Sequence, residues 1–190
     1  AEYLELEKVS ERKHEYQAGK IYAMTGGTLN HSLIGGNIVT ALNNALSAND
    51  KTCLVANSDA KIFVEKANAF VYPDASVICE PPEYHGINRQ AITNPILIVE
   101  VLSKTTGHYD RGEKFRKYCA LPSFKEYVLI DQDQPVVDTL YRADAKTWHM
   151  VTTIGLEKSI ELHSIACTLS MEVIYRNIRD LQEPQFRLDF

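Results

Sequence analysis

Two carboxylates stand inside apolar, strand-like segments, where a charged group is unfavourable. Glu100 interrupts ILIVEV (96–101), and Asp74 follows a proline in AFVYPDASVIC (69–79). An ionised, unpaired carboxylate in a core costs several kcal/mol, so each must be protonated, hydrogen-bonded or bound to a cation. Glu100 has a structural alternative, a carboxylate held by Ser103. Asp74 has another, a turn at Pro-Asp, although β-type residues on both sides weaken it.

The two acids can converge on one point if their strands pair. Period-two alternation places Glu100 on the same strand face as Ile96 and Ile98. Pro73 removes a ladder donor and so marks an edge, a bulge or a distortion, which can re-aim Asp74. Converging carboxylates repel unless a divalent cation lies between them. Such oxygen ligands suit Mg²⁺ or Mn²⁺, which keep several waters and also bind phosphate.

A cation for the phosphate or for an attacking water is expected on the next helix, about residues 109–120. Asp110, Lys114 and Tyr118 fall at i, i+4 and i+8 and therefore share a face, with Lys117 close to it. The alternative for Lys114 is an ion pair with Asp110 on a surface helix.

The elements that position these residues are predicted from periodicity. Helices are expected at 2–12, from Asn30 as N-cap to about 49–50, at 109–120 and at 169–178. Strands are expected at 53–56, 61–65, 69–79, 96–101, 127–131, 136–142 and 148–154. Residues 14–24 predict a hairpin turning at Ala18-Gly19, and the proline-containing segment 80–95 predicts a loop. The pattern indicates an α/β domain, a sheet flanked by helices.

Composition limits the classes of protein. The 190 residues are 45% hydrophobic and 24% charged, which favours one domain over 1–190. No apolar run is long enough for a membrane span and the N-terminus is charged, so we expect a cytoplasmic protein without membrane contact. The four cysteines are far apart and no histidines show zinc-ligand spacing, so neither a disulfide framework nor a zinc site is expected. The net charge of -5 argues against nonspecific coating of nucleic acid, although a local basic patch is compatible with it.

The ordered set of motifs resembles the Uma-two family of restriction endonucleases, a branch of the PD-(D/E)xK nuclease superfamily. The resemblance runs from about Tyr3 to Ile178 and includes the hairpin and His31. Its motifs, in order, are Pro73-Asp74, Glu100-Val101-Leu102-Ser103, Asp110-Arg111-Gly112-Glu113-Lys114, Tyr118 and Glu126-Tyr127-Val128-Leu129-Ile130-Asp131.

This resemblance implies a restriction-endonuclease-like fold, with a mixed central β-sheet flanked by helices and an N-terminal β-hairpin. It implies that Asp74 and Glu100 are the acidic metal ligands, with the backbone carbonyl of Val101 as a further ligand. Leu102 replaces the lysine usually found two residues after the second acid. The role then moves to the following helix and nominates Lys114.

Several other residues are accessory candidates. Lys117 and Lys104 are alternatives to Lys114. Glu15 resembles an early glutamate of the family and could approach the metal, although a hairpin residue on the surface is the simpler expectation. His31 could contact phosphate or carry a proton, or could be a local hydrogen-bond partner. Ser103, Asp110 and Tyr118 complete the set.

The expected activity is Mg²⁺- or Mn²⁺-dependent hydrolysis of DNA phosphodiester bonds, with DNA as partner and pairing as a homodimer implied by the resemblance. One alternative is a catalytically inactive nuclease-fold module that binds DNA or protein, which a Lys114 amine pointing away from the carboxylates would favour. Another is a purely structural domain, with Glu100 a satisfied core group and Asp74 a turn residue.

Overall fold

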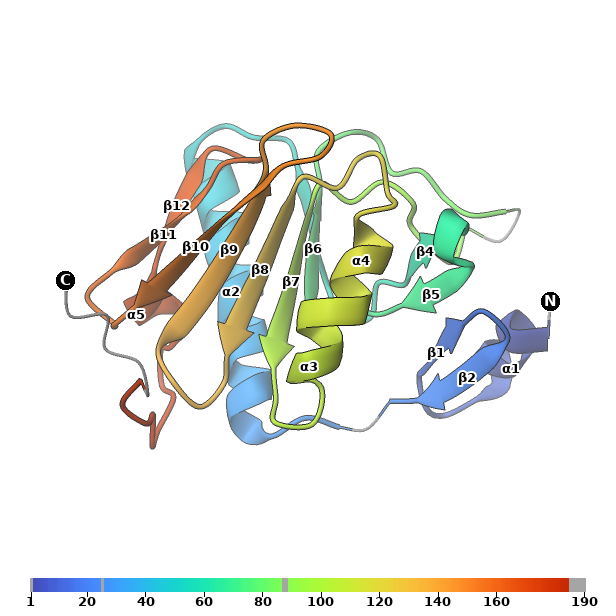
Figure 1. Ribbon diagram of the computed structural model, residues 1–190, viewed down its shortest axis with the longest axis horizontal. Coiled ribbons are helices and arrows are strands. Elements are labelled where there is room, and N and C mark those ends of the chain that lie inside the picture. Colours follow the sequence, from blue (N-terminus) through green and yellow to red (C-terminus); the bar gives the residue numbers. More distant parts are fainter. Residues whose placement is uncertain (1, 25, 87–88, 185–190) are drawn as a thin grey trace.

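A six-stranded mixed sheet forms the centre of the molecule (Figure 1). The computed structural model describes residues 2–24, 26–86 and 89–184; residues 87–88 of the expected loop and residues 1, 25 and 185–190 of the expected domain lie outside this part. In sheet order the strands are β10 (Trp148–Ile154), β9 (Val136–Arg142), β8 (Glu126–Asp131), β7 (Leu97–Leu102), β6 (Ala75–Ile78) and β3 (Leu54–Asn57). The pair β7 and β8 is parallel and the other neighbours are antiparallel.

Helices cover both faces of this sheet, as Figure 1 shows with α2 behind it and α3 and α4 in front. Helix α2 (Leu29–Ala48) buries one apolar stripe against Leu97, Val99 and Val101 of β7. On the opposite face, Ile98 and Leu102 pack with residues of α4 (Phe115–Tyr118) and the segment after it. Strand β7 is therefore buried on both sides, as its nearly continuous apolar sequence predicts.

A second sheet carries the N-terminal hairpin. Its order is β2 (Lys20–Ala23), β1 (His14–Gln17), β5 (Ala69–Val71) and β4 (Ile62–Val64), with α1 (Glu2–Val9) beside it. Ala18 and Gly19 both have positive φ, 44° and 98°, which matches the twist of a two-residue hairpin turn. This confirms the predicted hairpin, and the mixed sheet flanked by helices confirms the predicted fold class.

The expected strand 69–79 is two strands in two different sheets. Strand β5 pairs with β1 and β4, whereas β6 pairs with β3 and β7. Tyr72, Pro73 and Asp74 connect them, and Asp74 lies in a bend. The distortion expected at the proline is therefore a change of sheet. It places Asp74 directly before β6, a strand of the central sheet.

Three helix predictions need correction. The N-cap of α2 is Thr28, whose hydroxyl accepts from the His31 amide at 3.2 Å, rather than Asn30. The helix expected at 109–120 is interrupted: it consists of α3 (Gly107–Tyr109), a π-helical turn (Asp110–Lys114) and α4, and its polar residues Asp110, Lys114 and Tyr118 are buried. The helix expected at 169–178 is reduced to α5 (Met171–Ile174), because the preceding residues form β12 (Cys167–Ser170), paired with β11 (Ser159–Leu162).

The expectation of no disulfide was wrong. Cys53 and Cys79 form a disulfide across β3 and β6. Leu54 pairs with Ile78 in this antiparallel ladder, so the two cysteines are the next opposite positions. A separation of 26 residues carries no sign of this contact until the pairing of the strands is known.

We predict that loss of this disulfide destabilises the fold. For a loop closed over 26 residues, the free energy of unfolding should fall by about 3–4 kcal/mol when Cys53 and Cys79 are both replaced by Ser. Urea unfolding with and without dithiothreitol measures the change. The reductant should lower the midpoint of the wild type and of Cys119→Ser, and leave the double variant unchanged. Equal midpoints of wild type and double variant would contradict the prediction.

Candidate active site

Asp74 and Glu100 lie across from each other on neighbouring strands. Ala75 of β6 pairs with Val99 of β7 in an antiparallel register. Asp74, which directly precedes Ala75, therefore lies opposite Glu100, which directly follows Val99. Opposite positions of an antiparallel pair point to the same face of the sheet. Both acids line one cavity of about 580 Å³, together with residues of the hairpin, α2 and α3. The predicted pairing of the two strands is confirmed.

Asp74 is held by two hydrogen bonds. Its Oδ2 accepts from the amide of Val101 at 2.7 Å, and its Oδ1 lies 2.9 Å from His31 Nε2. The hydrogen bond with Asp74 raises the pKa of His31 above its usual value, although burial opposes this. The N-cap at Thr28 starts α2 so that His31, in the first turn, faces Asp74. The predicted metal ligand Asp74 and the accessory candidate His31 therefore form one hydrogen-bonded pair.

Glu100 is almost completely buried, at 3% exposure, on the face of β7 that faces α4. Its Oε1 accepts from Tyr118 Oη at 2.9 Å and lies 2.9 Å from Lys114 Nζ. Burial raises the pKa of Glu100 well above its usual value, and Lys114 opposes the shift. Ser103, expected as its structural partner, instead hydrogen-bonds to the hydroxyls of Thr105 and Thr106, so that expectation was wrong.

The face of Glu100 was predicted only in part. Ile98 packs on the cluster beside α4, as alternation predicts, whereas Ile96 packs on the cluster under α2. Ile96 precedes the first strand residue, Leu97, so the period of two does not extend to it.

Lys114 is the centre of an acidic cluster. Its Nζ lies 2.9 Å from Glu100 Oε1, 3.4 Å from Glu15 Oε1 and 3.6 Å from Asp110 Oδ1. Burial alone would lower the pKa of Lys114, but these carboxylates raise it well above its usual value, and the amine stays charged. The i,i+4 ion pair of Lys114 with Asp110 is present, but its expected place on a surface helix was wrong, because both side chains are buried.

Glu15 belongs to this cluster, contrary to the expectation of a surface residue. It is 7% exposed, because β1 faces the central sheet across the cavity. Its Oε1 accepts from the Tyr72 amide at 3.2 Å, and its Oε2 accepts from Tyr109 Oη at 3.2 Å. The hairpin therefore closes the site through its one buried acid.

The alternative lysines do not contact the two strand acids. Lys117 Nζ donates to Gln17 Oε1 at 2.5 Å and to Tyr109 Oη at 3.1 Å. Lys104 is exposed and lies 3.9 Å from Asp133. Lys114 is the lysine that the structure places beside Glu100.

Residues 72, 109 and 17 join the site without a signal in the sequence that we recognised. Tyr72 contributes its backbone amide to Glu15, and Tyr109 joins Glu15 to Lys117. Gln17 donates to Glu15 Oε2 at 3.4 Å. Gln17 follows Glu15 at i+2 on a strand, so a period-two reading of the hairpin could have placed both on the cavity side.

The donor set fits a hard divalent cation. Three carboxylates, those of Glu15, Glu100 and Asp110, lie within 3.6 Å of the Lys114 ammonium, and Asp74 is paired with His31 in the same cavity. Within residues 2–24, 26–86 and 89–184, no group of three or more His, Cys, Asp or Glu side chains has the arrangement of a metal site. Two carboxylates with backbone and water oxygens completing the shell is the usual manner of binding Mg²⁺.

The chain has a mixed α+β fold, with a central sheet flanked by helices. A solved structure described as a "putative nuclease belonging to DUF820" from Anabaena variabilis matches with a TM-score of 0.69 over 87% of this chain and 91% of its own, at 18% identity, which is a likeness of fold. The family model described as Uma2, "Putative restriction endonuclease", matches residues 1–173. The chain belongs to the Uma2 family.

Two relatives come from Synechocystis sp. and are named as uncharacterized proteins. The one named slr1290 is 38% identical over 177 residues, which cover 93% of this chain and 90% of the relative. The one named sll1609 is 32% identical over 161 residues, covering 85% and 90% respectively.

We predict that Lys114→Met destabilises the protein strongly. Its removal leaves Glu15, Glu100 and Asp110 buried without a cation, and breaking a buried ion pair in this way costs about 3–5 kcal/mol. Lys104→Met is the matched control, expected to change the free energy of unfolding by about 1 kcal/mol or less because that lysine is exposed. Urea unfolding checks both. Equal midpoints of the two variants would contradict the central position given to Lys114.

Proposed function

We propose that this protein is a Mg²⁺- or Mn²⁺-dependent endonuclease that hydrolyses DNA phosphodiester bonds. One observation carries the proposal: Asp74 and Glu100 face the same cavity from adjacent strands, and Lys114 Nζ lies 2.9 Å from Glu100. Membership of a family described as restriction endonucleases supports a nuclease, and DNA as substrate follows from that description.

The residues have separate roles in this proposal. Asp74 and Glu100 would hold the cation, with the carbonyl of Val101 as a further ligand. Such an ion lowers the pKa of a bound water and withdraws charge from the scissile phosphate. Lys114 orients the attacking water and balances the negative charge that develops on the phosphate. His31 fixes the orientation of Asp74 through its hydrogen bond.

A second candidate is a nuclease-fold module that binds DNA without cleaving it. The observation in its favour is that Glu100 Oε1 is already shared by Lys114 and Tyr118, so the carboxylate has internal partners without a metal ion. Against it, Lys114 points toward the carboxylates rather than away from them.

Pairing of two chains and a cytoplasmic location stay predictions. No helix in the described part of the chain has the length and apolar character to cross a bilayer.

We predict that Asp74→Asn and Glu100→Gln each reduce DNA cleavage by about 100-fold or more, because each removes a charged ligand while keeping the side-chain shape. The assay follows supercoiled, linear and single-stranded DNA in Mg²⁺ or Mn²⁺. Asp144→Asn, on an exposed turn, is the matched control and should cleave as the wild type does.

Lys114→Arg separates catalysis from folding. It keeps a positive charge in the acidic cluster but moves the donor, so we expect a folded protein by circular dichroism with little cleavage. Lys117→Met should retain most of the activity. DNA binding without cleavage by the wild type would favour the second candidate, and wild-type cleavage by Asp74→Asn would contradict the proposed mechanism.

A further inference from the structure

A second cavity, of about 330 Å³, lies beside the candidate active site. It is lined by α1, by the segment that follows α1 and by the residues before β4. Tyr72 lines both cavities: its backbone carbonyl faces Lys114, whereas its hydroxyl donates to Glu7 in the second cavity. Tyr72 therefore lies between the two cavities.

Lys61 is the unusual residue of this second cavity. Its side chain is only 7% exposed, and no carboxylate pairs with it in the part of the chain that the structure describes. Its ammonium rests instead on aromatic rings, 5.1 Å from the centroid of Tyr3, 5.5 Å from that of Tyr72 and 6.0 Å from that of Phe70. Burial lowers its pKa, which Glu7 opposes.

Three acids, Glu7, Glu11 and Asp59, line this cavity, and two of them have other partners. Glu7 accepts from Tyr72 Oη at 2.8 Å and from the amide of His14 at 3.2 Å. Asp59 lies 2.5 Å from Lys13 Nζ. A buried cation on an aromatic floor, without an ion pair among the described residues and lining a small cavity, is an arrangement suited to a compact anion.

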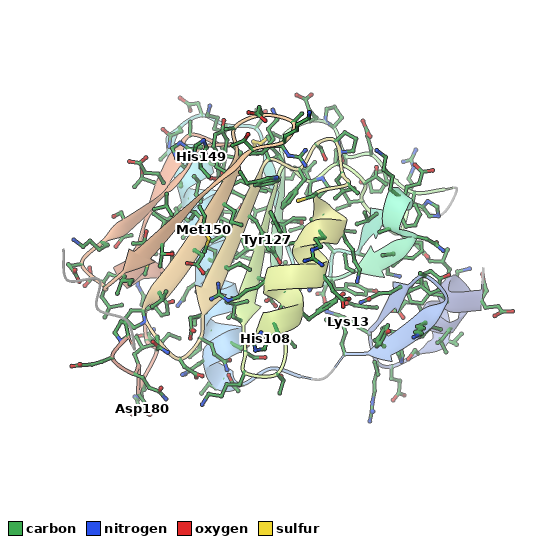
Figure 2. The ribbon with its side chains drawn as sticks, in the orientation of Figure 1. Lys13, His108, Tyr127, His149, Met150 and Asp180 are labelled. Atoms are coloured by element: carbon green, nitrogen blue, oxygen red, sulfur yellow. A yellow bond between two sulfur atoms is a disulfide. The ribbon has the colours of Figure 1, made fainter. Side chains whose placement is uncertain are left out.

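Further basic side chains line the same cavity. Lys8, Arg12 and Lys13 stand around Lys61, and Figure 2 labels Lys13. Lys8 and Lys13 have acidic partners at Glu5 and Asp59, so Lys61 and Arg12 are the cations of this cavity without a recorded acidic partner among the described residues. A lysine acts as a point charge toward phosphate, whereas an arginine can add a two-pronged contact.

We propose that this cavity, which we call the Lys61 pocket (lined by Lys61, Arg12, Lys13 and Tyr72), binds a backbone phosphate of the nucleic acid next to the scissile one. The inference rests on the proposed function for the nature of the ligand. A polynucleotide carries a phosphate at every nucleotide, and Tyr72 lines both cavities, so a strand bound at Asp74 that runs along Tyr72 would present another phosphate to the Lys61 pocket. Phosphate contacts of this kind set the register of a strand on the protein.

The first test measures binding without turnover. A short labelled DNA duplex is titrated in EDTA, at several salt concentrations, with the wild type, Lys61→Met, Lys61→Arg and Lys66→Met. Loss of a charge-assisted contact should weaken binding of Lys61→Met by about tenfold and reduce the log-log salt slope by about one. Lys61→Arg should restore most of the affinity. Lys66 is an exposed lysine just after β4, so Lys66→Met should bind as the wild type does.

The second test needs no variant. Inorganic phosphate is titrated into isotope-labelled wild-type protein without metal, and amide shifts are followed by NMR. Saturable shifts at Lys61 and Ile62 are expected. Absence of shifts there, or wild-type affinity and salt slope in a folded Lys61→Met, would overturn the inference.

The two proposals fail separately. A protein that binds DNA through Lys61 without cleaving it would contradict the endonuclease and keep the Lys61 pocket. A protein that cleaves DNA while a folded Lys61→Met binds it normally would keep the endonuclease and overturn the Lys61 pocket.

Discussion

The ammonium of Lys114 among buried carboxylates is the interaction on which the site depends. Glu100 stands inside an apolar strand, and Glu15 and Asp110 converge on it from the hairpin and the π-helical turn. Without Lys114 these acids would repel one another in a medium that screens charge poorly. The lysine therefore joins three separate elements: the hairpin, β7 and the π-helical turn.

Two features of the fold position Glu100 and Asp74. Strand β7 is buried on both faces, so a charged side chain on it points into the protein and not toward solvent. The side chain of Glu100 is on the face toward α4. The change of sheet at Pro73 brings Asp74 to the end of β6, across from Glu100. One edge strand of the central sheet, β10, lies away from this site, where Figure 2 shows His149 and Met150. The candidate active site thus lies between the central sheet and the sheet that carries the hairpin.

Much of this arrangement could be predicted from the sequence. An acid in an apolar strand, a proline before an acid and a lysine at i+4 from Asp110 are local signals, and the structure brings these residues together. Contacts that depend on the pairing of distant strands could not be predicted. The disulfide between Cys53 and Cys79 needs the register of β3 on β6, and the burial of Glu15 needs the position of the hairpin over the cavity. The spacing of residues along the sequence gives neither the register of β3 on β6 nor the position of the hairpin.

The most direct test of the central claim is the position of a divalent ion. Crystals soaked in Mn²⁺ should give an anomalous difference peak in contact with carboxylate oxygens of both Asp74 and Glu100, and the peak should be lost in Asp74→Asn. A wild-type crystal with no peak between these two residues, or with each residue on a different ion, would contradict the shared metal site and the hydrolytic function built on it.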